Sequence, residues 1–166
     1  MTTAHLFWHG NLTEYELTSI KSLKANGFNV IVWSFADSAL PLPSGIESRN
    51  AEELLSKDFM NQHTYEYWNT SDPKTAMQEQ WSIEAYSDML KWKILAEYDG
   101  WWFDTDSICL KPSSSFDELY VSHQICAAYE STSISNRSFS VGAAVIAIPD
   151  KNLARQILSL AENIAN

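Results

Sequence analysis

Cysteine is scarce in this chain of 166 residues, which contains only Cys109 and Cys126. The two are too far apart to form a C-x-x-C pair, and neither has a histidine at the spacing that zinc sites use. Both lie in apolar runs, so we expect buried free thiols. Internal repeats and low-complexity tracts are also absent from the sequence.

Basic residues are few as well. The chain has 11 lysines and arginines against 21 aspartates and glutamates, which gives a formal net charge of -10. Such a protein repels phosphate backbones and offers no basic stripe to nucleic acid or to an anionic membrane. A partner that carries phosphate would therefore need a cation as a bridge.

Long apolar runs are missing too. None approaches the roughly 18 residues of a membrane helix, and the first residues lack the basic start and apolar body of a signal peptide. We therefore expect a cytoplasmic protein without a membrane span. What the chain does have is 45% hydrophobic and 13% aromatic residues, a globular mixture. At this length we expect one domain, residues 1–166, with its own core.

The hydrophobic pattern predicts an α/β fold. Residues 5–9 (HLFWH) form a short apolar run of strand type, and residues 28–35 (FNVIVWSF) form a second one. Between them, Thr13 is a plausible N-cap, apolar residues recur at helical spacing, and the pair Asn26-Gly27 ends the helix. A strand, a helix and a strand within about thirty residues form a βαβ unit, which implies a parallel sheet.

Further elements are predicted along the rest of the chain. The clearest is a helix over 82–98, which Asp99-Gly100 ends. The others are a loop over 37–48, one or two helical turns over 51–55, an irregular or weakly helical stretch over 56–80, strands beginning at 101 and over 124–129 and 140–148, and an amphipathic helix over 150–164 with Leu153, Ile157, Leu160 and Ala161 on its apolar face.

Two acids follow the aromatic run in the stretch WWFDTD, residues 101–106. From Asp88 the preceding helix descends roughly 15 Å to its end, and the strand climbs back roughly 13 Å by Asp104. If the two pack antiparallel, Asp104 returns to the level of Asp88. We therefore expect Asp88, Lys91, Asp104 and Asp106 around one mouth at the end of the sheet, where open α/β sheets bind their ligands.

A divalent cation would suit this group of acids. Two ionised carboxylates a few ångströms apart repel each other, and a cation relieves that repulsion. Oxygen ligands favour Mg²⁺ or Mn²⁺, with water and ligand phosphates in the remaining positions. A nucleoside diphosphate fits such a site, and the metal would let a protein with a net charge of -10 attract it.

Other interpretations of the acids remain open. The pair could be a solvated turn, with Asp88 and Lys91 as an ordinary ion pair on the helix surface. A calcium loop fails, because Ile108 and Cys109 stand where an oxygen ligand and a glycine are required. A phosphohydrolase with an aspartate nucleophile is a weaker alternative, since residues 107–166 lack a second acidic pair.

The same residues resemble a known family. The segments 86–91 (YSDMLK) and 103–106 (FDTD) are similar to the Asp-x-Asp signature of sugar transferases. That signature is shared by capsular polysaccharide transferases, yeast-type mannosyltransferases and clostridial glucosylating toxins. The separation of Asp88 and Asp104, 104 − 88 = 16 positions, matches the family. The runs LFWHG and VIVWS look like its first two strands, and the resemblance extends from residue 5 to about residue 112.

The resemblance implies a GT-A fold, a Rossmann-like, mainly parallel sheet flanked by helices, which ends earlier here than family members generally do. It also implies a nucleoside diphosphate sugar, with UDP-sugar favoured over GDP-sugar, bound together with Mn²⁺ or Mg²⁺. Trp8 would stack on the base, Asp88 and Lys91 would contact the donor, Asp104 would reach its ribose and sugar, and Asp106 would hold the metal, with Asp104 beside it.

By the same resemblance, Asp104 and Asp106 would be the catalytic pair of a retaining transfer of a hexose to the hydroxyl of a glycan or another acceptor. The sequence departs from the family at Lys91, where an arginine is usual, and at Trp101, where a smaller residue is usual. A lysine cannot make the forked contact of a guanidinium. These departures and the early end make a non-catalytic nucleotide-sugar-binding or structural domain the alternative.

Overall fold

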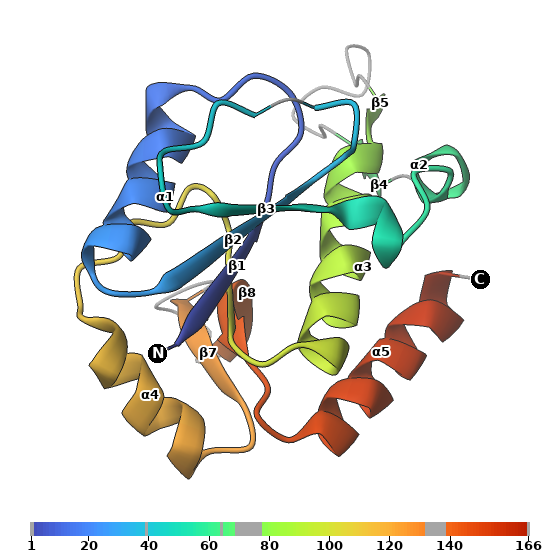
Figure 1. Ribbon diagram of the computed structural model, residues 1–166. Coiled ribbons are helices and arrows are strands. Elements are labelled where there is room, and N and C mark those ends of the chain that lie inside the picture. The colour runs from blue at the N-terminus through green and yellow to red at the C-terminus, as the bar shows by residue number, and fades with distance from the viewer. Residues whose placement is uncertain (1, 39, 64, 69–77, 132–138, 166) are drawn as a thin grey trace.

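A six-stranded mixed sheet forms the centre of the computed structural model, which describes residues 2–38, 40–63, 65–68, 78–131 and 139–165 (Figure 1). The order of its strands is β3-β2-β1-β6-β8-β7. The first four strands of that order are parallel, and β8 is antiparallel to both β6 and β7. The expected α/β fold with a mainly parallel sheet is confirmed. Its strands are β1 (Thr3–Phe7), β2 (Asn29–Ser34), β3 (Glu47–Asn50), β6 (Trp101–Phe103), β7 (Cys126–Ser131) and β8 (Phe139–Ala147).

Helices cover both faces of this sheet. On one face lie α1 (Glu14–Ala25) and α4 (Ser113–Ser122) (Figure 1). On the other face lie α3 (Ser82–Glu97) and α5 (Lys151–Ala165). The 3₁₀ helix η1 (Ala51–Glu53) and the short helix α2 (Phe59–Gln62) also pack on the α3 side. The predicted helical turn near residue 51 is therefore confirmed.

Alternation along the strands divides the core into two clusters, because successive side chains point to opposite faces of the sheet. Leu6 and Phe103 belong to the cluster under α1 and α4. Phe7 and Trp102 belong to the cluster under α3 and α5. Both sides of the central strands β1, β2 and β6 are buried, as expected for a parallel sheet between helical layers.

The first βαβ unit forms as its sequence predicts. Thr13 caps α1, and the Glu16 side chain accepts a hydrogen bond from the Thr13 backbone N–H, so the two make a capping box. Gly27 follows the helix with a φ of 86°, a conformation that glycine adopts without strain. β2 then pairs in parallel with β1, with Thr3 opposite Asn29.

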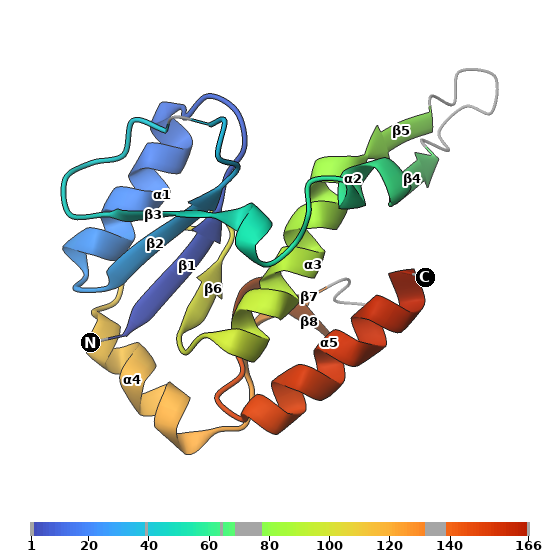
Figure 2. The ribbon, with the colours of Figure 1, turned by 45° about the vertical axis from the view of Figure 1, so that its right-hand side comes forward.

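Three regions differ from the predictions. The stretch 56–80, expected to be irregular or weakly helical, contains the short helix α2 but also β4 (Tyr65–Trp68) and β5 (Gln78–Trp81), which pair with each other and extend away from the main sheet (Figure 2). Within that stretch, residues 64 and 69–77 lie outside the described residues. Helix α4 was not predicted, and β3 occupies the end of the expected loop. β3 is a polar strand (ESRN) at the edge of the main sheet, and β4 and β5 lie outside that sheet. These three strands therefore lack the apolar pattern of a central strand, by which they could have been predicted.

Two side-chain expectations also change. Leu160 was expected on the apolar face of the last helix, but 63% of its surface is exposed. Cys109 is buried and Cys126 is half-buried, and both are free thiols.

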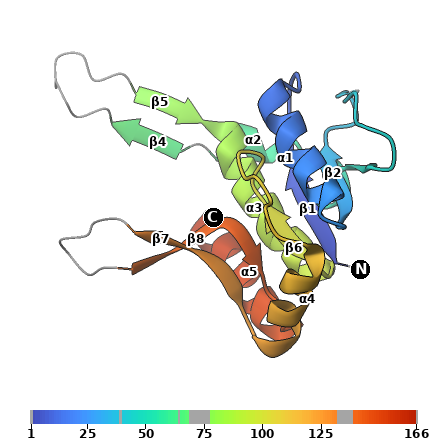
Figure 3. The same ribbon diagram turned by 90° about the vertical axis from the view of Figure 1, so that its left-hand side faces the viewer.

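β4 and β5 extend to the same side of the body as the far ends of β7 and β8 (Figure 3). None of the described helices has the length and hydropathy that a membrane crossing requires.

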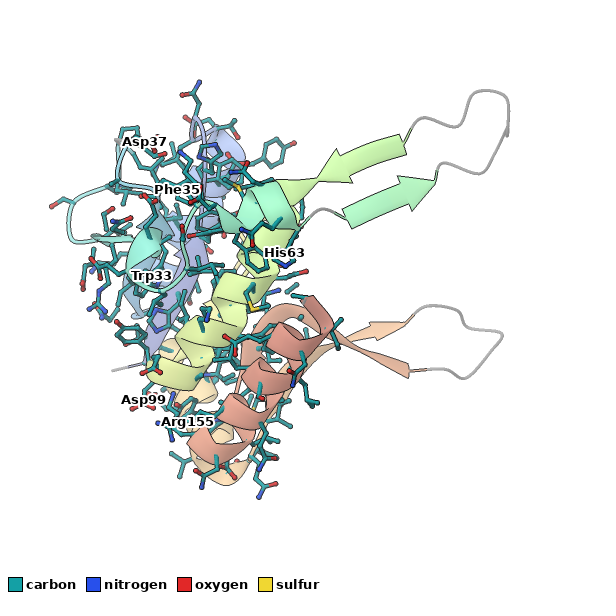
Figure 4. The ribbon with its side chains drawn as sticks, turned by 90° about the vertical axis from the view of Figure 1, so that its right-hand side faces the viewer. Trp33, Phe35, Asp37, His63, Asp99 and Arg155 are labelled. Carbon is teal, nitrogen blue, oxygen red and sulfur yellow. The ribbon has the colours of Figure 1, made fainter. Side chains whose placement is uncertain are left out.

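The two ends of the sheet carry different groups. In Figure 4, Trp33, Phe35 and Asp37 follow one another along β2 and past its carboxyl end, whereas Asp99 lies near the opposite end of the molecule. At that opposite end His5 is buried, accepts a hydrogen bond from Trp33 Nε1 at its Nδ1 atom (3.2 Å), and donates from Nε2 to the carbonyl oxygen of Asp99 (3.1 Å). These two bonds fix the neutral Nε2–H tautomer of the ring.

Candidate functional site

A cleft of about 980 Å³ lies where β1 and β6 reach their carboxyl ends. Its walls come from the residues after these two strands and from the first turns of α1 and α3. Trp8, Asp88, Asp104 and Asp106, four of the five predicted site residues, all line it. The other lining residues are Phe7, His9, Glu14, Tyr15, Glu16, Thr18, Ser19, Ile83, Glu84, Ser87, Trp102, Thr105 and Ile108.

The carboxylate of Asp104 is held by its own strand. β6 ends at Phe103, and the Asp104 N–H still donates to the carbonyl oxygen of Ala144 in β8 at 2.7 Å. The chain then turns, because the N–H of Ser107 donates to the carbonyl oxygen of Asp104 at 3.0 Å. Trp102 Nε1 donates to Asp104 Oδ1 at 2.6 Å. The turn leaves Asp106 exposed at the cleft.

Lys91, the fifth predicted residue, lies beneath the cleft and does not line it. Its side chain is only 3% exposed, and Nζ donates to Asp88 Oδ1 at 3.0 Å. The same Nζ lies 3.7 Å from Asp104 Oδ1 and 5.5 Å from the centre of the Trp102 ring. The predicted return of Asp104 to the level of Asp88 is therefore confirmed, with one ammonium group joining the two acids.

Burial raises the pKa of Asp104. The positive charge of Lys91 and the hydrogen bond from Trp102 act against this effect, while the negative charges of Asp106 and Asp88 add to it. A further cation near this carboxylate would stabilise its ionised form. The electrostatics of the site therefore favour a positively charged ligand.

The residues of the cleft fit a hard cation that takes most of its ligands from water or from phosphate oxygens. Among the residues that the structure describes, no group of three or more histidine, cysteine or acidic side chains could enclose a metal ion. Asp104 and Asp106 supply two carboxylates within one turn. Mg²⁺ and Mn²⁺ accept such a set, because they retain water or phosphate oxygens in the remaining positions.

Trp8 extends β1 into the cleft wall. Its backbone N–H donates to the carbonyl oxygen of Trp33 at 3.0 Å, so the ladder between β1 and β2 continues past Phe7. The indole Nε1 donates to the carbonyl oxygen of Asn11 at 3.2 Å. The half-buried ring packs against the cluster beneath α1 and also lines the cleft. An aromatic ring fixed in this way offers a flat apolar face to a ligand.

The contribution of α1 to the cleft was not predicted from the sequence. Glu14, Tyr15 and Thr18 line the cleft from its first turns, and so does the buried Ser19. The hydroxyl of Ser19 is buried and has no hydrogen-bond partner among the described residues. Its position next to Ile20, on the face that the helix buries, could have identified it, because a polar residue on an apolar face calls for an explanation.

The chain is similar to known glycosyltransferases. Residues 13–131 match the family described as "Glycosyltransferase sugar-binding region containing DXD motif". A solved structure titled "PaToxG Glycosyltransferase" has the same fold, with a TM-score of 0.59 and 16% sequence identity. The alignment covers 98% of this chain and 61% of that one, so this chain spans about 61% of the length of the solved structure. No curated protein matches the sequence.

Proposed function

The chain belongs to the glycosyltransferase family whose sugar-binding region contains a DXD motif, and we propose that it transfers a hexose from a nucleoside diphosphate sugar to a hydroxyl acceptor with the help of Mn²⁺ or Mg²⁺. One observation carries this proposal: an aromatic ring, Trp8, and three acids, Asp88, Asp104 and Asp106, line a single cleft at the carboxyl ends of two parallel strands. Such a cleft is where open α/β sheets bind nucleotides. We further propose that residues 1–166 act as one nucleotide-sugar-binding domain.

The charge of the cleft supports a metal-dependent mechanism. The described lining residues include no lysine or arginine. The acids are Glu14, Glu16, Glu84, Asp88, Asp104 and Asp106. Lys91 is buried beneath Asp88 and Asp104. A diphosphate could not approach this wall without a cation to screen the carboxylates. The proposed donor and the proposed metal therefore depend on each other.

The proposed roles follow from position. Trp8 would stack on the base, since its ring is fixed at the cleft wall. We propose UDP rather than GDP as the nucleotide. Asp88 and Asp104 would accept hydrogen bonds from ribose and sugar hydroxyls. Asp106, which is exposed, would hold the metal ion with Asp104 beside it. When bound, Mn²⁺ or Mg²⁺ would neutralise negative charge on the departing diphosphate.

The chain's own residues would contribute orientation. Trp102 fixes one oxygen of Asp104, and the turn after β6 holds Asp106 within two residues of it. Alignment of donor and acceptor in such a cleft removes much of the entropy cost of the reaction. Transfer with retention of configuration to a glycan or another hydroxyl is the form that we propose.

A non-catalytic domain that only binds the nucleotide sugar is the second candidate. The observation that favours it is the place of Lys91, whose ammonium group is enclosed by Asp88, Asp104 and Trp102 and is not part of the cleft wall. The protein then offers no lysine or arginine of its own, among the described lining residues, to a leaving diphosphate. Donor hydrolysis separates the two candidates, since only an enzyme releases the hexose.

A thermal-shift panel tests the donor site. UDP, GDP and their common hexose conjugates are each added with and without Mn²⁺ to the wild type, to Asp106→Asn and to the control Asp58→Asn, which makes the same change at an exposed position that does not line the cleft. A ligand at about 100 times its Kd adds roughly 2.7 kcal/mol to the free energy of unfolding. We expect a Mn²⁺-dependent shift with one nucleotide that Asp106→Asn abolishes and Asp58→Asn retains.

Turnover is then measured with the donor that binds. Release of free hexose, lost in Asp106→Asn, would support the transferase, whereas binding without release would support the non-catalytic domain. A shift with none of the nucleotides would contradict both. Release of inorganic phosphate from a phosphate monoester would instead support the weaker phosphohydrolase alternative.

A further inference from the structure

The ammonium group of Lys91 is buried. Its partners Asp88 and Asp104 line the cleft, whereas Lys91 does not. It lies 3.0 Å from Asp88 and 3.7 Å from Asp104, and its side chain is 3% exposed. Lysine is almost never buried without a partner, because the lost hydration must be replaced by ion pairs and hydrogen bonds. Asp88 and Asp104 supply this replacement, and both keep a large exposed fraction, 46% and 37%.

Lys91 joins two elements that carry site residues. Asp88 and Lys91 stand three residues apart on α3, while Trp102 and Asp104 belong to β6 and the residue after it. The Trp102 indole and the Lys91 ammonium both meet the same oxygen of Asp104, Oδ1. Within the described part of the chain, the contacts of this carboxylate use Oδ1, so Oδ2 is the oxygen left for a ligand.

The position of Lys91 argues against direct contact with the donor. Its ammonium group is enclosed by two carboxylates and the face of an indole ring, 5.5 Å from the ring centre. A ligand in the cleft would meet the acids first, since they line the wall and Lys91 does not. Removal of the ammonium group would take away a positive charge that both carboxylates contact, so Asp88 and Asp104 would repel each other more strongly.

We propose that Lys91 is a positioning residue, whose ammonium group orients the carboxylates of Asp88 and Asp104 so that they accept the hydroxyl groups of the bound nucleotide sugar. This inference rests on the proposed function. It differs from the role implied by resemblance, in which the residue at this position contacts the donor itself. Lys91 then acts on the ligand only through the two acids.

The first test compares single variants. Lys91→Met removes the charge at similar volume, and Lys93→Met is the matched control, because Lys93 pairs with Glu162 of α5 at 2.7 Å and does not line the cleft. Binding of UDP-glucose in the presence of Mn²⁺ is measured by titration calorimetry. We expect Lys91→Met to weaken binding about tenfold, which corresponds to about 1.4 kcal/mol, and Lys93→Met to leave it unchanged.

The decisive test asks whether Lys91 acts through the acids. The variant Asp88→Asn is compared with the double variant Asp88→Asn/Lys91→Met, because Asp104, a proposed contact of the metal and the donor, has to stay intact for binding to be measured. In Asp88→Asn the ammonium group keeps Asp104 as its partner at 3.7 Å, and in the double variant the ammonium group is absent, so neither variant contains a buried unpaired charge. If Lys91 acts on the ligand through the acids, Lys91→Met weakens UDP-glucose binding less in the Asp88→Asn background than in the wild type, because part of the coupling has already been removed. A loss of the same size in both backgrounds would mean that Lys91 acts on the donor independently of Asp88, and would overturn the inference.

The outcomes also separate this inference from the proposed function. If the wild type binds neither UDP-glucose nor any other nucleotide sugar of the panel with Mn²⁺, the proposed function fails and the inference fails with it. If the wild type binds and a folded Lys91→Met binds equally well, only the inference is overturned. Circular dichroism of each variant establishes whether it is folded.

Discussion

Trp102 Nε1 donates a hydrogen bond of 2.6 Å to Oδ1 of Asp104, so a buried core residue directly orients the first acid of the Asp-x-Asp pair. The two residues lie on the same side of the chain, because they are separated by one position in an extended segment. Trp101 points to the other face of the sheet, where its ring packs against Phe116 of α4. Its indole N–H has no hydrogen-bond partner among the described residues. Neighbouring tryptophans therefore have different tasks.

This difference predicts the effect of replacing each indole by phenylalanine. Trp102→Phe keeps an aromatic ring but removes the donor to Asp104. The lost hydrogen bond costs about 1.5 to 3 kcal/mol of the free energy of unfolding, and the Asp104 carboxylate is no longer held in one orientation for the ligand. We expect donor affinity to fall at least about tenfold. Trp101→Phe removes an N–H that bonds to nothing described, so donor affinity should not change. Titration calorimetry with the nucleotide that shifts the wild type checks both. Equal losses in the two variants would contradict the assigned role of Trp102.

The raised pKa of Asp104 predicts that donor binding is sensitive to acid. An acid whose pKa is raised takes up its proton at a higher pH than an ordinary aspartate, for which the pKa is 3.8. Protonation removes the charge that the metal and the hydroxyls require, so affinity should fall as the pH drops towards this raised pKa. Titrations from pH 7.5 to 4.5 measure the effect. Asp104→Asn should bind weakly with a flatter pH profile, and an identical profile in wild type and variant would oppose the assignment.

The lowered pKa of His5 predicts that the free energy of unfolding falls in acid. Burial lowers the pKa of His5 from 6.5 to about 4, so the folded state binds a proton less readily than the unfolded chain. The stabilising contribution of neutral His5 is complete above pH 6.5 and is lost as the pH falls from 6.5 towards 4. The shift corresponds to about 3 kcal/mol. Urea unfolding at pH 7.5, 5.5 and 4.5 measures it.

The control for His5 is His5→Gln, whose amide can donate to the Asp99 carbonyl but does not titrate. The variant should be less stable than the wild type at neutral pH, since the bond from Trp33 to Nδ1 is lost. Its stability should fall less steeply between pH 6.5 and 4. Equal slopes for the two proteins would show that other groups cause the acid sensitivity.

Gly100 predicts a strict requirement for glycine at the end of α3. Its φ is 132°, and a Cβ atom at this position would lie 2.5 Å from the backbone oxygen of Thr3 and 3.2 Å from His5 Nε2. Backbone atoms of a central strand cannot move away cheaply, so Gly100→Ala should cost more than the 1 to 3 kcal/mol of backbone strain alone. Gly10→Ala is the matched control, because its φ is 95° but nothing lies within 4 Å of the added atom. Urea unfolding of both variants should show a much larger loss for Gly100→Ala.

Local signals in the sequence predicted the framework of the fold. The Thr13 cap, the apolar spacing after it and Asn26-Gly27 determine α1 without help from the rest of the chain, and the run after Phe28 determines β2. Helix α3 followed in the same way from its spacing. Helix α4 was not predicted because few of its residues, Phe116 and Tyr120, pack against the core. β4 and β5 were not predicted because they pair with each other outside the main sheet.

The candidate site was likewise predicted only in part. By itself the sequence determined the spacing of Asp88 and Asp104, and since helix rise and strand rise are fixed, this spacing brings the two acids to one level. Only the tertiary structure decided that Lys91 lies beneath them with its ammonium group enclosed, that Trp102 holds Asp104, and that α1 supplies a wall of the cleft with Ser19 in it. These relations depend on which elements pack together and how deeply, and no local pattern of residues contains that information.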